Sequence, residues 1–428
     1  MQYDSFRILL ATAAQHDLEI AQFDVRTAFL YGRLQEDIYM RIPEGLIIPE
    51  ESDSVVCKLE RALYGLKQAS RCWNKTFCEF LKSFKFKECD ADSCVFRGSV
   101  DECEVYLLLY VDDGLIISET KQALDIVISH LKKSFDITTQ KLEMFVGLQV
   151  ERNRTNKSIF LYQELYINKI LKRFNMDKAN PVSTPADMQA IPIPSDNYNS
   201  SNSKIPYREA VGSLMFLATV SRPDIAYAVS VVSRHLNNFN ASHWQAVKRI
   251  FKYLKRTINL GICYTNIKCS HNLMGFSDAD YAGDIETRRS TTGYIFELYG
   301  GPITWASQRQ RMVTLSTTES EYIAACAAAK EAIWIRRLLA DIGYQCDNAT
   351  VLNIDNQSAK QLVKNPVFHK RTKHVDVRYH FIREKMESKE INVKYISSKS
   401  QHADILTKAI PRDQFIFLRN KIGMNTHN

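Results

Sequence analysis

The spacing of apolar residues predicts a chain in which helices and strands alternate. Apolar side chains recur at helical spacing in residues 6–15, 69–84 and 121–135. Residues 20–25 and 105–110 are rich in β-branched, aromatic and aliphatic side chains, which is typical of buried strands. One face of the second helix would carry Trp73, Phe77, Phe80 and Leu81. The first part of the chain is therefore expected to be a mixed helix and strand domain.

The pattern changes twice further along the chain. Residues 180–206 are rich in Pro, Ser and Asn and are expected to form a flexible connector, and residues 207–264 are expected to be helical and basic. From Asn272 onward an α/β unit begins with a strand meander. Its expected strands are 273–277, 294–299, 303–307, 350–354 and 391–396, and its expected helices are 317–339, a basic one at 371–386 and a last one beginning near Gln401.

Composition narrows the class of protein. The chain has 428 residues, enough for two or three domains, and its hydrophobic (45%) and charged (24%) fractions are those of a globular protein. A net charge of +8 fits a partner that carries phosphates, although a solvated basic surface would give the same number. None of the ten cysteines forms a Cys-x-x-Cys pair, which favours reduced thiols over a zinc site. No membrane-length apolar run or signal-peptide pattern occurs, so we expect an intracellular protein without a membrane partner.

Two adjacent carboxylates, Asp112 and Asp113, interrupt the apolar run 105–117. Burying charged groups is costly unless they are paired or bind a metal. Asp113-Gly114 also predicts a hairpin turn, which would explain the pair without any chemistry. Nucleotidyl transfer needs hard oxygen ligands for divalent cations, and Asp24 at the end of strand 20–23 offers a third, although an aspartate at such a position, taken alone, is more often a helix N-cap.

A second set of acids lies in the C-terminal unit. Asp278 ends a strand, Glu319 and Glu321 open the long helix, Asp355 closes strand 351–354, and Asp404 opens the expected last helix. Acids at strand ends and helix starts can converge on a pair of metal ions that hydrolyses a phosphodiester. Each is also explained by helix capping, and the boxes Ser316–Glu319 and Thr318–Glu321 leave both glutamates open as the ligand.

Two further residues near these acids have open roles. Asp280 is a weaker candidate that would orient its neighbour. His402 is expected either to protonate a leaving group or to be a surface histidine.

In combination, these segments resemble the reverse transcriptase of copia-type LTR retrotransposons and the ribonuclease H domain of the same Pol polyproteins. The resemblance covers essentially the whole chain. The matching polymerase segments are residues 22–32 (QFDVRTAFLYG), 62–69 (ALYGLKQA) and 110–113 (YVDD), and the matching nuclease segments are 277–283 (SDADYAG), 319–324 (ESEYIA), 355–359 (DNQSA) and 403–408 (ADILTK).

The resemblance implies an α+β multidomain fold. It comprises a right-hand polymerase palm with partial fingers and a thumb/connection, followed by an α/β ribonuclease H-like domain. The implied boundaries are 1–155 for fingers and palm, 156–268 for thumb and connection with the linker 180–206, 269–412 for the ribonuclease H-like domain, and 413–428 for a tail.

The resemblance also implies site residues and cofactors. Asp24, Asp112 and Asp113 would hold metal in the palm, and Asp278, Glu321, Asp355 and Asp404 would hold it in the nuclease, with two Mg²⁺ per site and Mn²⁺ as an alternative. Nucleotide or template would contact Phe29, the expected gate against a ribose 2′-OH, together with Gly65, Gln68 and Tyr110. Residues 144–148 resemble the strand near the primer end.

A nucleic-acid track is expected between the two sites. Lys248, Arg249, Lys252, Lys255 and Arg256 recur at near-helical spacing and would present a basic stripe, joined by His374 from a basic helix. The implied partners are an RNA template, a DNA primer, an RNA/DNA hybrid and deoxynucleotide triphosphates. The implied location is a cytoplasmic virus-like particle and the nucleus, in a DNA integration pathway.

The match begins within the family's fingers. The finger strands whose basic residues hold the incoming triphosphate are therefore expected to be missing, which places polymerase activity in question. The alternatives are a truncated remnant with ribonuclease H only, or a non-catalytic nucleic-acid-binding scaffold. The presence of all seven acids argues against a scaffold, because a scaffold does not need clustered charges.

Overall fold

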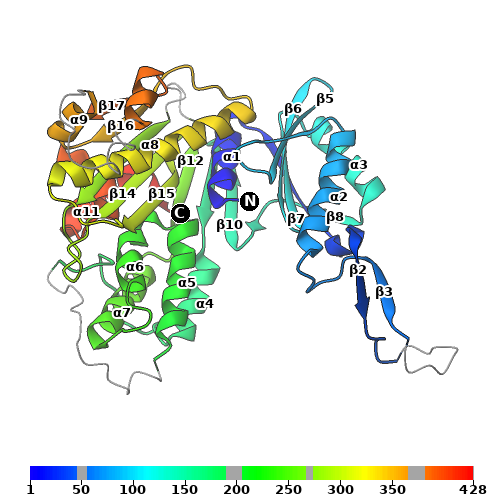
Figure 1. The fold of residues 1–428 in the computed structure, drawn as a ribbon, viewed down its shortest axis with the longest axis horizontal. Coiled ribbons are helices and arrows are strands. Elements are labelled where there is room, and N and C mark those ends of the chain that lie inside the picture. The colour runs from blue at the N-terminus through cyan, green and yellow to red at the C-terminus, as the bar shows by residue number, and fades with distance from the viewer. Residues whose placement is uncertain (46–54, 189–204, 267–272, 365–380, 428) are drawn as a thin grey trace. The chain divides into compact units, whose positions relative to one another are not determined.

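The chain, in this computed structural model, divides into two compact units (Figure 1). The first comprises Met1 and Leu18–Leu142, and the second comprises Gln2–Asp17 and Glu143–Asn428. The residues that the structure describes are 1–45, 55–188, 205–266, 273–364 and 381–427.

The first unit is built on a six-stranded antiparallel sheet with the strand order β4-β5-β6-β7-β1-β8, and a separate ribbon pairs β2 with β3. Its elements are β1 (Glu19–Val25), η1 (Ala28–Tyr31), β2 (Arg33–Met40), β3 (Cys57–Arg61), α2 (Ala69–Ser83), β4 (Lys87–Glu88), β5 (Val95–Val100), β6 (Cys103–Tyr110), β7 (Asp113–Ser118), α3 (Lys121–Ser134) and β8 (Ile137–Gln140).

The core of this unit lies between one face of the sheet and the helices α2 and α3. Trp73, Phe77 and Leu81 of α2 are buried, as the helical spacing predicted, and Phe80 is partly buried. Phe77 lies 5.7 Å from Phe135 between ring centroids, so the aromatic face of α2 locks onto the segment that follows α3. The buried aromatic and aliphatic area fixes the strands that carry the acids.

The hairpin between β6 and β7 differs from the prediction. Tyr110 pairs with Asp113, so the turn is Val111-Asp112, and Gly114 belongs to β7. Gly114 is needed for packing and not for the turn, because a Cβ there would collide with the ring of Phe23 on β1. Val111 takes a positive φ of 59°, which is strained for a β-branched residue.

The second unit contains two five-stranded sheets. One is antiparallel with the order β18-β12-β11-β10-β9, and the other has the order β15-β14-β13-β16-β17, in which β16 and β17 run parallel to β13. Its elements are α1 (Tyr3–His16), β9 (Met144–Phe145), β10 (Leu148–Asn153), β11 (Ser158–Tyr162), α4 (Glu164–Arg173), α5 (Tyr207–Val220), η3 (Pro223–Ile225), α6 (Ala226–Ser233), α7 (Ala241–Arg256), β12 (Leu260–Thr265), β13 (Met274–Asp280), β14 (Thr291–Leu298), β15 (Gly301–Arg309), α8 (Thr317–Asp341), β16 (Thr350–Ile354), α9 (Gln357–Lys364), β17 (Ile391–Tyr395), η4 (Ser398–Ser400), η5 (His402–Leu406), α11 (Arg412–Lys421) and β18 (Met424–Thr426).

The second of these sheets has the expected ribonuclease H-like arrangement. A meander of β13, β14 and β15 is followed by α8, which crosses one face of the sheet, and then by the parallel strands β16 and β17. Helix α8 is long, and a row of alanines lies buried along it, which lets the helix approach the sheet closely. The fold class predicted from the sequence is confirmed for both units.

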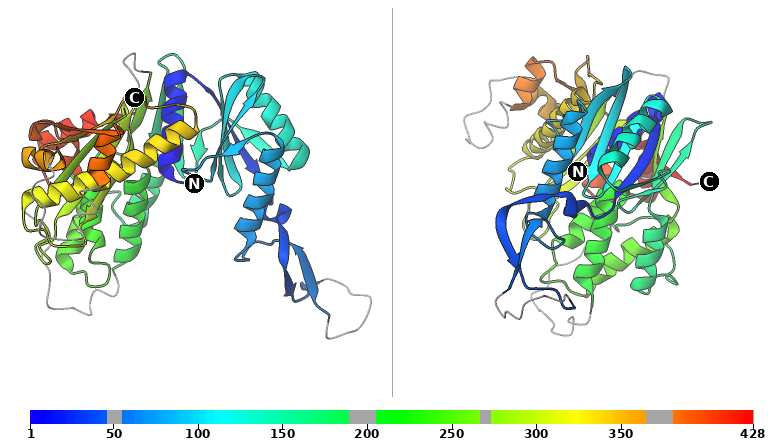
Figure 2. Two further views of the ribbon diagram at one scale, coloured as in Figure 1. Left: turned by 45° about the horizontal axis from the view of Figure 1, so that its top comes forward. Right: turned by 90° about the vertical axis from the view of Figure 1, so that its right-hand side faces the viewer.

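The region 207–264 is not one helical run. It forms α5, η3, α6 and α7, which gather into one bundle (Figure 2), and then strand β12 begins at Leu260. Pro223 has no N–H to continue a helix, and Asn240 caps α7 by accepting from the N–H groups of Ser242 and His243. The predicted helix therefore ends as a strand, because residues 260–264 are buried beside β11.

The N-terminal helix α1 belongs to the second unit, although the sequence placed it with fingers and palm. Its Arg7 is almost fully buried and donates to the carbonyls of Ile303 (2.7 Å) and Val220 (2.7 Å), with its guanidinium over the ring of Trp305. A buried guanidinium is stable only when its donors are satisfied, and the second unit satisfies them.

The C-terminal part also differs from expectation. Segment 413–428 is not a tail, because α11 and β18 lie in it and β18 pairs with β12. The expected last helix near Gln401 is the short 3-10 turn η5, followed by α11 after Pro411. Residues 144–148 are not one strand: they form the hairpin β9–β10, with Val146 and Gly147 at positive φ. Of the basic helix expected at 371–386, residues 371–380 lie outside the described part of the chain.

Two general expectations can be compared with the described residues. All nine cysteines in that part of the chain are free thiols. No helix in the described ranges combines the length and the apolar character that crossing a membrane requires.

Candidate active sites

Three carboxylates of the second unit meet at one end of the β13–β17 sheet. Asp278 lies on β13, Glu321 on the first turns of α8, and Asp355 directly after β16. One oxygen from each lies within 4.8 Å of the others, and in the described part of the chain this is the only group of three acids, histidines or cysteines that is so close. Asp278 and Glu321 are buried, while Asp355 is partly exposed and gives access to the group.

A fourth carboxylate, Asp404, reaches this group by close packing of η5. Asp278 pairs with Gly293 on β14, and a Cβ at Gly293 would lie 2.6 Å from the methyl of Thr407 and 2.9 Å from Cβ of Leu406. Only glycine lets η5 approach the strand this closely. The Gln401 amide also donates to the carbonyl of Ser277 at 2.9 Å, which anchors the start of η5 beside Asp278.

Two residues next to Asp404 complete the site, and the sequence reasoning assigned them no role. The Thr407 hydroxyl donates to Oδ2 of Asp278. Lys408 Nζ lies 2.9 Å from Oδ1 of Asp404 and 3.5 Å from Oδ2 of Asp278, so its ammonium sits between two of the acids. Their positions three and four residues after Asp404 on a turn were the available signal.

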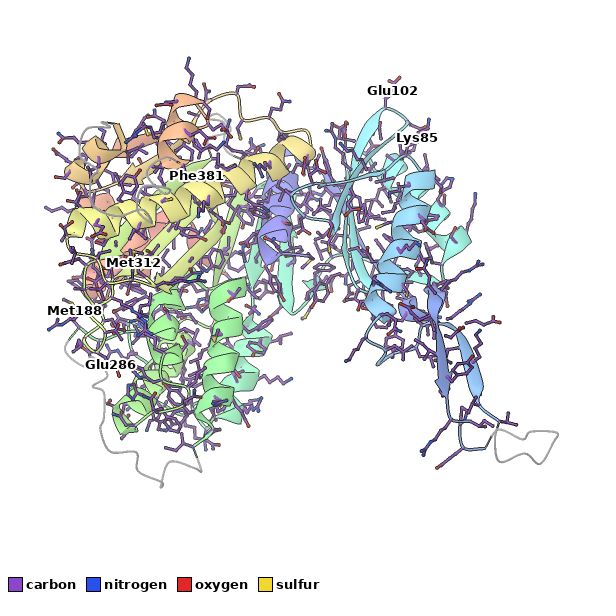
Figure 3. The ribbon with its side chains drawn as sticks, viewed as in Figure 1. Lys85, Glu102, Met188, Glu286, Met312 and Phe381 are labelled. Carbon is purple, nitrogen blue, oxygen red and sulfur yellow. The ribbon has the colours of Figure 1, made fainter. Side chains whose placement is uncertain are left out.

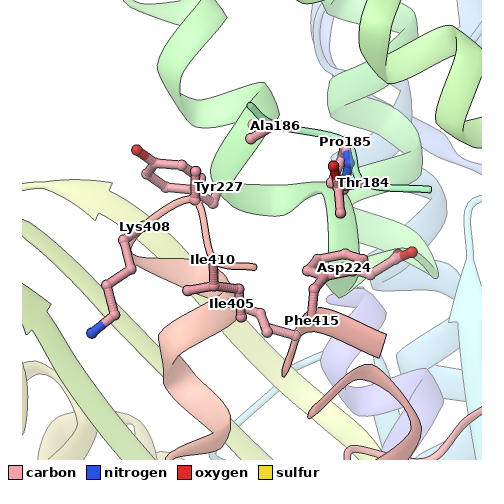
Figure 4. Close-up of a pocket in the computed structure, with 11 residues that line it drawn as sticks. Thr184, Pro185, Ala186, Asp224, Tyr227, Ile405, Lys408, Ile410 and Phe415 are labelled. Carbon is pink, nitrogen blue, oxygen red and sulfur yellow. The ribbon is translucent and has the colours of Figure 1, made fainter. Parts of the chain in front are cut away.

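Lys408 reaches the acid group with its ammonium and also lines a small cavity next to η5. The cavity of about 10 Å³ is lined by Asp224, Tyr227, Ile405 and Phe415, among others, and has room for about one water. Figure 4 shows the Lys408 side chain directed away from Asp224 and Phe415. The ammonium of the lysine therefore acts on the carboxylates of Asp278 and Asp404.

The electrostatics of the nuclease group reflect burial of like charges. Burial, and next the carboxylates of Asp278 and Asp355, raise the pKa of Glu321 well above its usual range. Burial and then Asp278 raise the pKa of Asp404, and Lys408 opposes that rise. Without a cation, the folded protein therefore favours protonation of these acids.

The structure separates the two candidate glutamates. Glu319 accepts from the N–H of Leu315 at 2.8 Å, and its own N–H donates to the Ser316 hydroxyl, so it caps α8. Glu321 lies instead in the acid group. Asp280 is not part of the close triad.

His402 is not part of that triad. Its Nδ1 lies 2.6 Å from Oε1 of Glu297, and its ring stacks on Phe276 with a centroid distance of 4.0 Å. The side chain is 13% exposed, so it is not a free surface residue, and its contacts fasten η5 to β13 and β14; its role as a proton donor stays a prediction.

The geometry of the group fits a divalent cation. Hard cations prefer carboxylate oxygens, and three are held close together here. The Glu321 Oε2 atom is buried and makes no hydrogen bond within the described structure. A buried acceptor without a partner is costly, and a cation would satisfy it.

The first unit holds the second set of acids at one end of its sheet. Asp24 on β1 lies opposite Asp113 on β7, and Asp112 occupies the hairpin turn. The turn is fixed from two sides: the N–H of Val25 donates to the Asp112 carbonyl (2.8 Å), and the Trp73 indole donates to the Val111 carbonyl (2.6 Å). All three acids are partly exposed and do not meet the 4.8 Å limit that the nuclease triad satisfies.

The palm acids still affect one another. Burial raises the pKa of Asp113, and the charges of Asp112 and Asp24 raise it further. Burial and the Asp112 charge likewise raise the pKa of Asp24, against the opposing charge of Arg26. The three carboxylates therefore share one electrostatic site.

The structure describes each of the residues expected to contact the nucleotide or the template. Phe29 on η1 lies 4.7 Å from the ring of Tyr64, and Gly65 follows with a φ of 96°. Gln68 occupies the N-cap position of α2, and Tyr110 ends β6 half exposed. The sequence reasoning gave Tyr64 no role, although burial and the charges of Asp112 and Asp24 raise its pKa, which places its hydroxyl beside the acids.

The basic stripe on α7 is only partly available. Arg249 donates to Asp187 (2.8 Å) and Thr184 (3.0 Å), and Lys255 donates to the Ala179 carbonyl (2.9 Å). These two side chains hold segment 179–187 against the helix. Lys248, Lys252 and Arg256 make no such contact with the described residues. His374 lies outside the described part of the chain.

Comparison with known proteins identifies the family of the chain. Residues 1–188 match the family described as reverse transcriptase (RNA-dependent DNA polymerase). The chain is 44% identical over 430 residues to the retrovirus-related Pol polyprotein from transposon TNT 1-94 of Nicotiana tabacum, covering 99% of this chain and 32% of that protein. It is 30% identical over 310 residues to the putative transposon Ty5-1 protein of Saccharomyces cerevisiae, covering 72% of this chain and 99% of that protein.

A solved structure, the foamy viral protease-reverse transcriptase in complex with an RNA/DNA hybrid, shares the fold. It aligns with a TM-score of 0.51 at 15% identity, covering 89% of this chain and 44% of that one. The chain belongs to the retrovirus-related Pol polyproteins of copia-type transposons, in their reverse transcriptase and ribonuclease H region. It spans about a third of the length of the first such polyproteins it matches.

Proposed function

We propose that this chain is an RNA-directed DNA polymerase that also cleaves the RNA strand of the hybrid it makes. The observation that carries the proposal is the buried group of Asp278, Glu321 and Asp355 on a ribonuclease H-like sheet. Family membership and the Asp24, Asp112 and Asp113 end of the palm sheet support the polymerase half.

In the nuclease, two side chains position the catalytic carboxylates and offset their negative charge. Thr407 orients Asp278 by its hydroxyl, and Lys408 offsets the charge of Asp278 and Asp404. A divalent cation, which we assign as Mg²⁺ with Mn²⁺ as an alternative and two per site, would be held by these acids and would activate water and stabilise charge on the scissile phosphate. The partly exposed Asp355 lies where an RNA backbone can enter.

In the palm, the same logic applies to a primer 3′-OH and a deoxynucleotide triphosphate. Asp24, Asp112 and Asp113 would hold the cations, and the fixed turn sets the position of Asp112. Phe29, packed on Tyr64, would present a flat surface to the sugar and exclude a 2′-OH. Tyr110 pairs with Asp113 at this end of the sheet, and we expect it to contact the nucleotide or the template together with Gly65 and Gln68.

The partners we propose are an RNA template, a DNA primer and their hybrid. Lys248, Lys252 and Arg256 on α7 are the members of the predicted stripe that can contact a backbone through charge and shape. Binding through such contacts should depend on salt and tolerate sequence.

One specific observation favours a second candidate, ribonuclease H without polymerase activity. The nuclease acids converge in the structure, whereas the palm acids do not meet the same distance limit. A chain whose palm cannot close over a triphosphate would still cut a hybrid.

A paired assay distinguishes these functions. Primer extension on an RNA template and cleavage of a labelled hybrid are followed with Mg²⁺ in the wild type, Asp112→Asn and Asp278→Asn. We expect Asp112→Asn to lower extension by about 10³-fold or more and leave cleavage, and Asp278→Asn to do the reverse. Cleavage without extension in the wild type would support the nuclease-only candidate. If neither occurs and the hybrid is still bound, both enzyme proposals fail.

A further inference from the structure

Four arginines line an open pocket of the second unit, outside both acid sites. Arg234 ends α6, Arg289 lies in the loop between β13 and β14, and Arg309 and Arg311 lie at and just beyond the end of β15. The pocket has a volume of about 420 Å³, and its remaining lining is serine and glutamine. We call it the arginine groove. Figure 3 labels Glu286 and Met312, which lie in the two loops that flank it.

Asp284 fixes two of these guanidinium groups in place. Its Oδ2 lies 2.9 Å from Nη1 of Arg234 and 3.0 Å from Nη1 of Arg309, and all but 8% of its side chain is buried. Burial alone would raise the pKa of Asp284, but hydrogen bonds from Thr287 and the two arginines hold it well below its usual range. The aspartate is therefore ionised at neutral pH and keeps the arginines preorganised.

The remaining two arginines are not neutralised within the described structure. The guanidinium groups of Arg289 and Arg311 make no ion pair or hydrogen bond with any described residue. With Arg234 and Arg309 sharing a single carboxylate, the four arginines leave a local excess of positive charge, against which the same loop offers only the exposed Glu286. Such an excess in a concave site attracts anions.

The shape and lining favour a phosphate backbone over a base or a nucleotide. The pocket has no aromatic or large apolar side chain on which a base could stack. A second open pocket of about 500 Å³ shares Ser233 and Arg234 with it and continues past Arg208, Asn237 and Asn238. The polar surface is therefore elongated, as a strand requires.

The strand pairing of the sheet places the arginine groove near the nuclease site. Asp280, two residues after Asp278, pairs with Thr291 on β14, which pairs with Arg309 on β15. Two strand spacings separate Asp280 from Arg309, or roughly 10 Å. The charge of Arg234 also lowers the pKa of Asp280, although burial raises it overall.

We propose that the arginine groove binds backbone phosphates of the nucleic-acid duplex that the nuclease site cuts. The proposal rests on the proposed ribonuclease H function and names a contact for its substrate. Asp278 lies two residues before Asp280 on β13, so the acid site and Arg309 are roughly 12 Å apart, and with a rise of about 3.4 Å per nucleotide the contacted phosphate lies about three nucleotides from the scissile bond.

The test maps the contact phosphate by phosphate. The full chain with Asp278→Asn binds hybrids that each carry one uncharged methylphosphonate at a different position in either strand. We expect one or two positions, about three nucleotides from the cleavage site, to weaken binding roughly fivefold to tenfold. Adding Arg289→Gln and Arg311→Gln should weaken binding of the unmodified hybrid about tenfold, lower the salt slope by about two and abolish sensitivity at those positions.

A matched control uses two exposed lysines, Lys389 and Lys394, at the other edge of the same sheet. Their change to Gln should leave the methylphosphonate profile intact. An unchanged profile and affinity in the double arginine variant, with unchanged thermal unfolding, overturns the proposal. If inorganic phosphate binds to the arginine groove but the methylphosphonate profile is the same in the double arginine variant and its parent, the proposal is also overturned, and the groove is a small-anion site. If the wild-type chain does not cleave the hybrid at all, that result would instead count against the proposed function.

Discussion

The two acid sites are built in different ways, and the difference shows what each requires before it can work. The nuclease acids come from β13, α8, the end of β16 and η5, and the fold packs them into a buried group. The palm acids come from neighbouring strands and one turn, and they stay partly exposed. Folding alone brings three of the nuclease acids within 4.8 Å of one another, whereas the palm acids do not meet that limit.

In the nuclease site, other residues must offset the repulsion between buried carboxylates, whereas the palm acids are partly exposed to solvent. Buried carboxylates repel one another, as the raised pKa of Glu321 shows, and Thr407, Lys408 and the glycine at position 293 hold them in place. In the palm, the corresponding constraint is backbone strain at Val111.

The largest expected effect separates function from stability at Glu321. Glu321→Gln keeps the shape of the side chain but cannot ionise, so hybrid cleavage should fall by about 10³-fold or more. In EDTA at pH 8, the same change should raise the unfolding free energy of the second unit by about 1–3 kcal/mol, because glutamine is neutral without taking up the proton that buried Glu321 requires. Hydrogen exchange of residues 274–341 measures the second quantity.

The pH dependence gives the sign of this effect. Because the pKa of Glu321 is raised in the folded state, that state binds more protons than the unfolded one. Wild-type stability in EDTA should fall as pH rises from the ordinary carboxyl range toward the raised pKa, and less so in Glu321→Gln. Glu319→Gln is the matched control and should change cleavage by less than about threefold, since it only caps α8. Equal losses in both variants would contradict the assignment.

The next effect concerns Lys408, whose ammonium lies between two of the nuclease acids. Lys408→Met removes an ammonium that competes with a cation for Asp278 and Asp404. The affinity for Mn²⁺, measured by calorimetry in an Asp112→Asn background, should rise about threefold to tenfold, which is 0.7–1.4 kcal/mol. Stability in EDTA should fall by only about 1 kcal/mol, because solvent screens a side chain that is 36% exposed. Weaker Mn²⁺ binding than in the exposed-site control Lys399→Met would show that Lys408 supports the cation.

A third change is directed at the palm alone. A Cβ at Gly114 would collide with the Phe23 ring, so Gly114→Ala should destabilise the first unit by about 1–3 kcal/mol and reduce extension near its unfolding temperature. Cleavage should stay unchanged. Gly212→Ala is the control, because it lies in α5 with open space around it and should stabilise that helix by up to about 1 kcal/mol. Loss of cleavage in Gly114→Ala would show that the units do not act independently.

The sequence predicts the acidic residues of both sites, but not the residues that hold them in position. Asp278 and Asp355 follow from strand ends, and the structure brings both to Glu321, which capping patterns could not distinguish from Glu319. Lys408 and Thr407 were missed because their effect depends on η5 crossing β14, a tertiary contact. The hairpin turn was misplaced for a similar reason, since Asp113-Gly114 is a good turn pair, yet Gly114 is required by Phe23 on a strand distant in sequence.

The smallest effect tests whether strain at the turn serves the palm acids. Val111→Gly relieves a left-handed β-branched residue, a gain of about 1–2 kcal/mol. Glycine also adds backbone freedom worth about 0.5–1 kcal/mol, so net stability should change little. Extension should nevertheless fall a few-fold, because Asp112 is no longer held, and hydrogen exchange at residues 110–114 should rise.

Val111→Asn is the comparison that isolates rigidity from strain. Asparagine tolerates the left-handed conformation but keeps a side chain, so it should gain stability and retain extension. The carbonyl that accepts from the Trp73 indole is unchanged in both variants. If Val111→Gly extends as fast as the wild type with equal protection, the turn does not position Asp112, and the palm site depends on its ligands alone.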